Sequence, residues 1–278
     1  MTTRLSRPRL VSGIAVGILV VLLFLLPLLY VLMMAFETPA HFLNSPMTPG
    51  TPTASNFSGA WHAANLGGEL INTILYSVVA GALSVALGLL IAFPVARRLL
   101  RGHSALYTFL FVGMFLPLSI IPMYAEARML GLYDNAIGYI LIHIAMPGLP
   151  GMSLAVVLLS AAIAAVPPEL DEAAWMEGAS YLSYLGRVIV PLVRPALLIA
   201  FLYAMLNDWN DIIGPVVLLN NPALEPVTKG LDSFFGANST EWTLLAAAIV
   251  IVSLPVVLLF IACQRQINRA SMTGALKG

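Results

Sequence analysis

Residues 207–211 form a polar cluster inside a long apolar stretch, and their types suit the recognition of a polar ligand. Ionisable groups within a membrane span are costly, so they face a cavity, a partner or each other. At about 100° per helical residue, Asn207, Asp208 and Asp211 share a face, whereas Trp209 and Asn210 point elsewhere. A polar face beside an aromatic ring suits a sugar, which offers hydroxyl groups and an apolar ring face. Alternatively, the acids satisfy broken helix backbone near 214–215, or they pair with a sister subunit. The cluster is Asn207, Asp208, Trp209, Asn210 and Asp211.

A second polar segment, residues 168–180, lies between long apolar runs. Four of the thirteen carboxylates of the chain fall within the nine residues 169–177, so this segment must lie in water. Helix-forming residues run from Glu169 to Glu177, and Gly178 then supplies the residue that most easily takes the left-handed conformation at a helix end. A second short helical pattern follows as far as Pro191. The sequence therefore predicts a helix–glycine–helix elbow beside a membrane.

Other chemistries lack their residue patterns. Cys263 is the one cysteine, so no disulfide within the chain can form, and the four histidines are scattered over separate segments without metal-ligand spacing. We find no G-x-x-x-x-G-K loop and no catalytic Ser/His/Asp or Cys/His arrangement. We therefore expect no catalytic residues, no metal, no cofactor bound by this chain, no ATP hydrolysis by it and no nucleic-acid partner.

Composition and hydropathy indicate the elements that must position both polar segments. The chain has 278 residues, of which 60% are hydrophobic and 9% charged. Several apolar runs exceed the roughly 20 residues that cross a bilayer. The fourth run contains Pro147, Gly148, Pro150 and Gly151, which predict a kink or a separate short helix. We interpret the first run as a retained anchor because it is too long for a signal peptide. The predicted spans are about 10–36, 70–96, 105–125, 135–165, 192–219 and 242–264.

The distribution of basic residues predicts the orientation of these spans. Eleven of the thirteen Lys and Arg residues lie before the first span, between the second and third, around 187–194, or after the sixth. Arg128 and Lys229 are the exceptions. Both termini and the elbow are therefore expected to be cytoplasmic.

The elbow resembles the EAA loop of permease subunits in binding-protein-dependent ABC importers. The resemblance is carried by Glu172-Ala173-Ala174 with Gly178 after three intervening residues, by Pro168-Glu169-Leu170 before them, and by Glu177-Gly178-Ala179-Ser180. This fuller pattern is similar to the carbohydrate branch typified by maltose uptake. Three further landmarks agree with it: Asn72, Trp209-Asn210-Asp211 and the terminal Gly274-Ala275-Leu276-Lys277-Gly278. Where the family commonly has Ile-Asp-Gly, this chain has Met176-Glu177-Gly178, which keeps the apolar–acidic–glycine chemistry.

The resemblance implies an all-α integral membrane protein with the type I ABC importer permease fold. It implies six transmembrane helices in a single permease domain, 1–278, with a cytoplasmic coupling-helix loop at 166–191. The loops at 37–69 and 220–241 would meet an extracytoplasmic solute-binding protein. The residues expected to contact the ATP-binding subunits, which are the motor of such an importer, are Glu169, Glu172, Ala173, Ala174, Glu177, Gly178 and Ala179. The C-terminal tail expected to reach toward the motor contains Gly274, Lys277 and Gly278.

The implied function is one half of the translocation path of an ATP-driven importer in the cell membrane. Its partners would be a second homologous permease subunit, two ATP-binding cassette subunits that hold ATP and Mg²⁺, the binding protein and the lipid bilayer. The solute would be a sugar, with a polyol or a glycerophosphate-like compound as alternatives. Two other classes remain open at this point: an ion-coupled secondary transporter that uses Asp208 and Asp211, and a signalling or assembly protein of the membrane.

Overall fold

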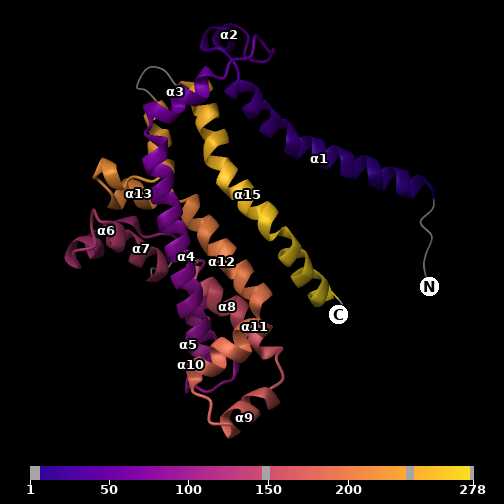
Figure 1. Ribbon diagram of the computed structural model, residues 1–278, viewed down its shortest axis with the longest axis vertical. Coiled ribbons are helices and arrows are strands. Elements are labelled where there is room, and N and C mark those ends of the chain that lie inside the picture. Colours follow the sequence, from indigo (N-terminus) through magenta and orange to yellow (C-terminus); the bar gives the residue numbers. More distant parts are fainter. Residues whose placement is uncertain (1–6, 146–150, 236–240, 276–278) are drawn as a thin grey trace. The chain divides into compact units, whose positions relative to one another are not determined.

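The structure, a computed structural model, describes residues 7–145, 151–235 and 241–275 (Figure 1). Within these ranges all elements of regular structure are helices, which confirms the predicted all-α class. The chain forms two compact units, which we describe separately. The first contains the chain up to Leu66 together with Leu231–Leu254, and the second contains Gly67–Gly230 and the chain from Pro255.

The first unit holds the N-terminal helix and a short helical cap. The side-chain amide of Asn56 donates hydrogen bonds to the carbonyls of Ala35 (2.9 Å) and Glu37 (2.7 Å), and so ties α3 to the end of α1. The apolar side chains of α1 are exposed from Ile14 to Leu29, which suits contact with lipid. The elements are α1 (Arg7–Ala35), α2 (Pro39–Asn44), α3 (Ser55–Ala63), the 3-10 helix η3 (Leu231–Phe234) and the first part of α15 (Trp242–Ala275).

The second unit contains both polar segments found in the sequence. In chain order its elements are α4 (Leu66–Ala96), α5 (His103–Gly113), α6 (Ile120–Met129), α7 (Ala136–Ala145), α8 (Gly151–Ala164), α9 (Glu169–Met176), α10 (Tyr181–Tyr184), the π-helical η1 (Leu185–Ile189), α11 (Val190–Leu192), α12 (Arg194–Trp209), α13 (Ile213–Leu218), the 3-10 helix η2 (Pro222–Leu224) and α14 (Val227–Gly230). Figure 1 shows α9 beyond α10 and α11, at the end of this unit.

Two apolar clusters within the second unit fix its helices. One cluster packs α4, α8, α10 and η1 together through buried residues such as Phe93, Leu159, Tyr184 and Ile189. The other joins α4, α6, α7 and α13 and includes Tyr76, Met123, Tyr139, Ile140 and Leu218. The first cluster underlies the predicted elbow, and the second underlies the segment that follows the polar cluster 207–211.

Among the residues that the structure describes, three helices, α1, α4 and α15, are long and apolar enough to cross a membrane, and they cover the predicted first, second and sixth spans. Two bent pairs would raise that number to five if each were one span. In one pair, α8 meets α9 at 88°; in the other, the segment Tyr181–Leu192 meets α12 at 89°. Because α9 carries four carboxylates in and beside it, we interpret its bend as the exit from the membrane rather than as part of a span.

The structure corrects two of the predicted spans. The span placed at 105–125 is two helices, because α5 ends at Gly113 and α6 begins at Ile120. Pro117 lies between them and disfavours helical backbone at the preceding residue. The span placed at 192–219 is likewise divided into α12 and α13. In the fourth predicted span, residues 147, 148 and 150 lie outside the described residues, and Gly151 is the first residue of α8.

Candidate coupling elbow and translocation path

The elbow has the geometry that its sequence predicts. Helix α9 ends in a Schellman motif, in which Gly178 N–H donates to the Trp175 carbonyl (3.0 Å) and Ala179 N–H donates to the Ala174 carbonyl (3.0 Å). Gly178 has φ +76°, a left-handed conformation that glycine adopts at little cost. No atom lies within 4 Å of the position that a Cβ would take on it. The space beside this glycine is therefore open to a partner.

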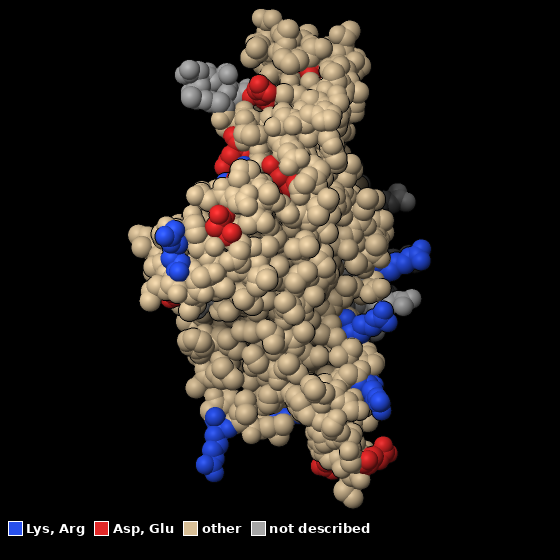
Figure 2. All heavy atoms as spheres, turned by 60° about the vertical axis from the view of Figure 1, so that its left-hand side comes forward, with Lys and Arg blue, Asp and Glu red and all other residues tan. Residues whose placement is uncertain are grey.

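The predicted motor-coupling residues divide into an outward set and an inward set. Glu169, Glu172, Ala173, Glu177 and Gly178 are exposed, and Figure 2 shows acidic side chains at the end of the second unit where α9 lies. Ala174 and Ala179 are half-buried against the apolar cluster beneath the elbow. Apolar side chains of α9 are exposed too, with Met176 at 89%. A surface that mixes exposed apolar and acidic side chains suits a protein partner.

Asp171 has a role that the sequence did not reveal. Its Oδ2 lies 2.6 Å from Arg97 Nε, and its Oδ1 accepts from the second guanidinium nitrogen at 3.0 Å. The third nitrogen of Arg97 donates to the Val166 carbonyl at 3.0 Å. The Tyr184 hydroxyl also donates to Asp171. We call Arg97, Asp171 and Tyr184 the elbow triad.

Tyr184 completes the elbow triad from beneath. Its side chain is fully buried, and its ring lies 5.7 Å from that of Phe93 and 5.1 Å from that of Trp175. Burial, followed by the hydrogen bond to Asp171, raises the pKa of Tyr184 to about 12. The hydroxyl therefore remains a donor to Asp171 at neutral pH.

The polar cluster 207–211 lies at the end of α12, and three of its members line a hollow of about 490 Å³. Asn207 and Asn210 line this hollow together with Tyr203 and Leu206 from the same helix. These four positions are spaced three and four residues apart, so they form one helical face. Residues 211–213, which follow the helix, also line the hollow.

The predicted division of faces is partly wrong. Asn210, which was expected to point away, shares the open face with Asn207, while Asp208 is 8% exposed and turned inward beside Trp209. The expectation grouped the residues by helical spacing around Asp208 and Asp211 and assumed a continuous helix. Because α12 ends at Trp209, Asp211 lies beyond it, and helical spacing no longer sets its direction.

Asp211 is held by a network that joins three segments of the chain. Its Oδ2 lies 2.9 Å from His143 Nε2 and accepts from the Tyr139 hydroxyl at 3.1 Å. Its Oδ1 accepts from the backbone N–H groups of Ile213 and Gly214, both at 3.1 Å, at the start of α13. Asp211 thus accepts hydrogen bonds from backbone N–H groups at a break between helices, which is one of the alternatives that the sequence left open. We call Tyr139, His143 and Asp211 the interior triad.

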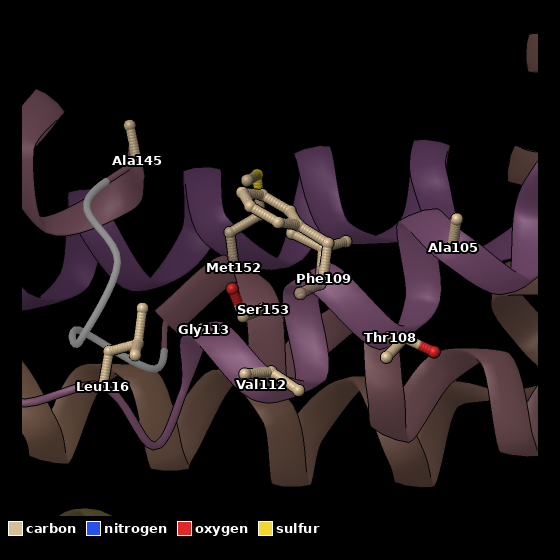
Figure 3. A pocket seen from close by; sticks show the side chains of 10 residues that line it. Ala105, Thr108, Phe109, Val112, Gly113, Leu116, Ala145, Met152 and Ser153 are labelled. Atoms are coloured by element: carbon tan, nitrogen blue, oxygen red, sulfur yellow. The ribbon is translucent and has the colours of Figure 1, made fainter.

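A second hollow is apolar and lies between α5, the end of α7 and the start of α8 (Figure 3). Its volume is about 550 Å³, and Phe109 and Met152 are among the side chains around it. Thr108 and Ser153 are its polar lining side chains. This lining suits another apolar surface rather than a polar solute.

The remaining predicted sites lie at the C-terminus, and the described chain also offers no metal centre. Gly274 is in the last turn of α15, while Lys277 and Gly278 lie outside the described residues. In the part of the chain that the structure describes, no three His, Cys, Asp or Glu side chains gather as metal ligands.

Comparison with known proteins decides the family. Residues 84–272 match the family described as the inner membrane component of binding-protein-dependent transport systems. The chain belongs to this family. It is a membrane-embedded transport subunit, not an enzyme, and it works with other components of an ABC importer.

Curated relatives and a solved structure agree over nearly the whole chain. It is 29% identical over 256 residues to the melibiose/raffinose/stachyose import permease protein MelC of Bacillus subtilis, covering 91% of each chain. It is 29% identical over 263 residues to the trehalose transport system permease protein SugB of Mycobacterium tuberculosis, covering 91% of this chain and 93% of the relative. A bacterial ABC transporter that imports the acidic polysaccharide alginate contains a chain with a TM-score of 0.80 and 25% identity, over 95% of this chain and 99% of that one.

Proposed function

We propose that this chain forms half of the translocation path of an ATP-driven importer for a sugar or a related small polar solute. The names of the relatives support the substrate class, since MelC and SugB are permease proteins for oligosaccharides. The family assignment decides against the ion-coupled alternative, because that class uses no ATP-binding partner.

In this proposal the exposed face of α9 is the contact with the ATP-binding subunit. Glu172 offers a carboxylate to a basic group, Ala173 permits close backbone approach, and the exposed Met176 adds apolar area. Gly178 leaves room for the partner at the turn of the elbow. Glu169, Glu177, Ala174 and Ala179 complete the motor-coupling set, of which the two alanines pack inward.

The candidate path runs along the open face of α12. Asn207 and Asn210 supply amide donors and acceptors, and Tyr203 supplies an aromatic ring, which together suit a hydroxyl-bearing ring. Asp208 and Trp209 are buried behind this face, and Asp211 holds the end of the hollow in place. We therefore assign solute contact to the two asparagines and a supporting role to the acids.

The proposed assembly places the chain in the inner membrane with six spans and both termini in the cytoplasm. It contains a second homologous permease, two ATP-binding cassette subunits that hold ATP and Mg²⁺, and an extracytoplasmic solute-binding protein. The expected tail, Gly274, Lys277 and Gly278, would reach toward the ATP-binding subunits. Deleting residues 274–278 should leave membrane insertion normal and alter ATPase regulation, as measured on the purified complex.

The open left-handed turn at Gly178 is the observation that carries the coupling proposal, and Gly178→Val tests it. The substitution forces a branched side chain into φ > 0 at a cost of about 1 kcal/mol or more, and it fills the space of the partner. Gly131→Val is the matched control, because Gly131 (φ +70°) also ends a helix in a Schellman motif with no atom within 4 Å of a Cβ. Gly131 lies in the connection between α6 and α7, away from α9.

We expect Gly178→Val to insert normally but to lose co-purification of the ATP-binding subunit, while Gly131→Val keeps it. Glu172→Lys should weaken the same association through like-charge contact. Equal retention of the ATP-binding subunit in all three variants would refute the elbow as the contact. In the same complex, Asn210→Ala should lower solute uptake while leaving assembly and ATP hydrolysis intact.

A further inference from the structure

We propose that Arg97 is a positioning residue that carries movement of the coupling helix α9 to the membrane helix α4, through its buried pair with Asp171. This inference rests on the proposed function. It assigns the elbow triad a role in coupling that is separate from contact with the motor.

The guanidinium of Arg97 joins the ends of three helices. Arg97 directly follows α4, and its N–H closes the last turn on the Phe93 carbonyl at 3.0 Å. Val166, whose carbonyl accepts from Arg97, follows the end of α8. Asp171 lies in α9 and takes the other two guanidinium contacts. A planar group with fixed donors holds such a junction with little freedom of rotation.

The pair is shielded from water. The side chains of Arg97 and Asp171 are 11% and 12% exposed, and Tyr184 covers Asp171 from the apolar cluster. A shielded pair is screened much less than a surface pair, and removing one partner leaves an uncompensated charge. The neighbouring Arg98 is exposed and provides a contrast within the same turn.

Asp171 attaches α9 to the rest of the second unit by a buried ion pair, beside the half-buried Ala174 and the Trp175 ring that lies against Tyr184. Of the eight residues of α9, all of them described, Asp171 is the one that is buried. Glu169, Glu172 and Ala173 face outward, and Ala174 is half-buried. A displacement of the outward face of α9 can therefore reach α4 through Asp171 and Arg97.

Helix α4 in turn packs against the candidate path. A Cβ on Gly81 of α4 would lie 3.2 Å from the backbone nitrogen of Met205 in α12, so the two backbones are in close contact there. Met205 is two residues before Asn207, which lines the open hollow. The contacts thus run from Asp171 through Arg97 and α4 to the helix that carries the two asparagines. Spatial contact alone does not establish coupling, so the test must measure it.

The test uses the complete importer in membrane vesicles and needs no knowledge of the solute. Cys263 is replaced by alanine and Asn210 by cysteine, and the rate at which a membrane-impermeant maleimide labels this cysteine is measured before and after trapping with ATP and orthovanadate. The same preparation gives ATP hydrolysis and co-purification of the ATP-binding subunit. In the otherwise wild-type complex, trapping should change the labelling rate.

Arg97→Gln should retain the ATP-binding subunit and its ATP hydrolysis. The change in labelling rate that trapping produces should be about tenfold smaller than in the wild-type complex, which is in the range of typical coupling between sites. Arg98→Gln removes the same charge from the adjacent exposed position and should behave as wild type. Arg97→Lys keeps the charge but not the three-way junction, and should give an intermediate response.

A full labelling change in Arg97→Gln would overturn the proposal. If Arg97→Gln instead lowers the yield of complex, Arg97→Lys decides, and a wild-type response there would overturn it as well. Failure of the wild-type complex to hold an ATP-binding subunit would refute the proposed function instead. An unchanged labelling rate in a wild-type complex that hydrolyses ATP would refute the placement of Asn210 in the path and, with it, the last step of this proposal.

Discussion

Two aspartates of the second unit, Asp171 and Asp211, are held in closely similar ways at two different places in the fold. At the elbow, Asp171 is bound by a base, Arg97, and by the hydroxyl of Tyr184. Beyond the end of α12, Asp211 is bound by a base, His143, and by the hydroxyl of Tyr139. In both triads the base comes from a distant part of the chain, 74 and 68 residues away.

The two triads differ in what else their aspartates bind. Asp211 also accepts from two backbone N–H groups at the start of α13, so it repairs a break in a helix. Asp171 makes no such repair, because it sits within α9 and connects that helix to its neighbours through Arg97. The same chemical arrangement therefore stabilises a fixed break in one place and joins separate helices in the other. Loss of the interior triad should reduce folding, whereas loss of the elbow triad should reduce coupling.

The largest effect is expected from His143→Leu. This change leaves the Asp211 carboxylate buried without its base, and breaking a buried pair in this way costs about 3–5 kcal/mol. We expect a marked loss of folded protein in the membrane and a lower midpoint of thermal unfolding. Normal yield and an unchanged midpoint would show that the interior triad does not stabilise the break.

A smaller effect on stability is expected from Gly214→Ala. Its Cβ would collide with the Asp211 carboxylate and lie 3.2 Å from His143 Cε1, so the interior triad must shift, at about 1–3 kcal/mol. The elbow offers the contrast in Gly178→Ala, where a Cβ meets no atom and the cost is conformational, about 1 kcal/mol. Thermal unfolding of both variants measures the difference, and a more damaging Gly178→Ala would reverse our ordering.

The smallest effects come from removing one hydroxyl in each triad, with Tyr139→Phe and Tyr184→Phe. Each loses a hydrogen bond of about 1 kcal/mol while the base remains in place. We expect Tyr139→Phe to lower the unfolding midpoint and leave ATP-driven labelling of the path unchanged. Tyr184→Phe should reduce that labelling change modestly. The same pattern in both variants would mean that the two triads do not differ in role.

The elbow could be predicted from the sequence because its signals are local. The carboxylates of 169–177 exclude this segment from the membrane, and Gly178 ends the helix at the residue where the left-handed conformation is observed. Neither triad could be found in this way. In the sequence, His143 was one of four scattered histidines, and Arg97 was one of the basic residues used to predict orientation. Each lies about 70 residues from its aspartate, so no short spacing marks the pair.

The interrupted spans show a second limit of the sequence. Hydropathy averages over a window, so it recorded 105–125 and 192–219 as continuous although each contains a break. Pro117 and Gly214-Pro215 were the available signals for those breaks. That Asn210 shares the open face is a matter of helical spacing rather than hydropathy, because Asn210 lies three residues after Asn207.

The two bends near the elbow determine how a mechanical load would travel. Helix α9 lies at 88° to α8, and the segment that leaves the elbow lies at 89° to α12. A force on α9 along the axis of α8 is resisted by the ladder of backbone hydrogen bonds in α8, while the Asp171–Arg97 pair joins the same load to α4. The elbow would therefore transmit a small displacement of α9 to the membrane helices with little bending.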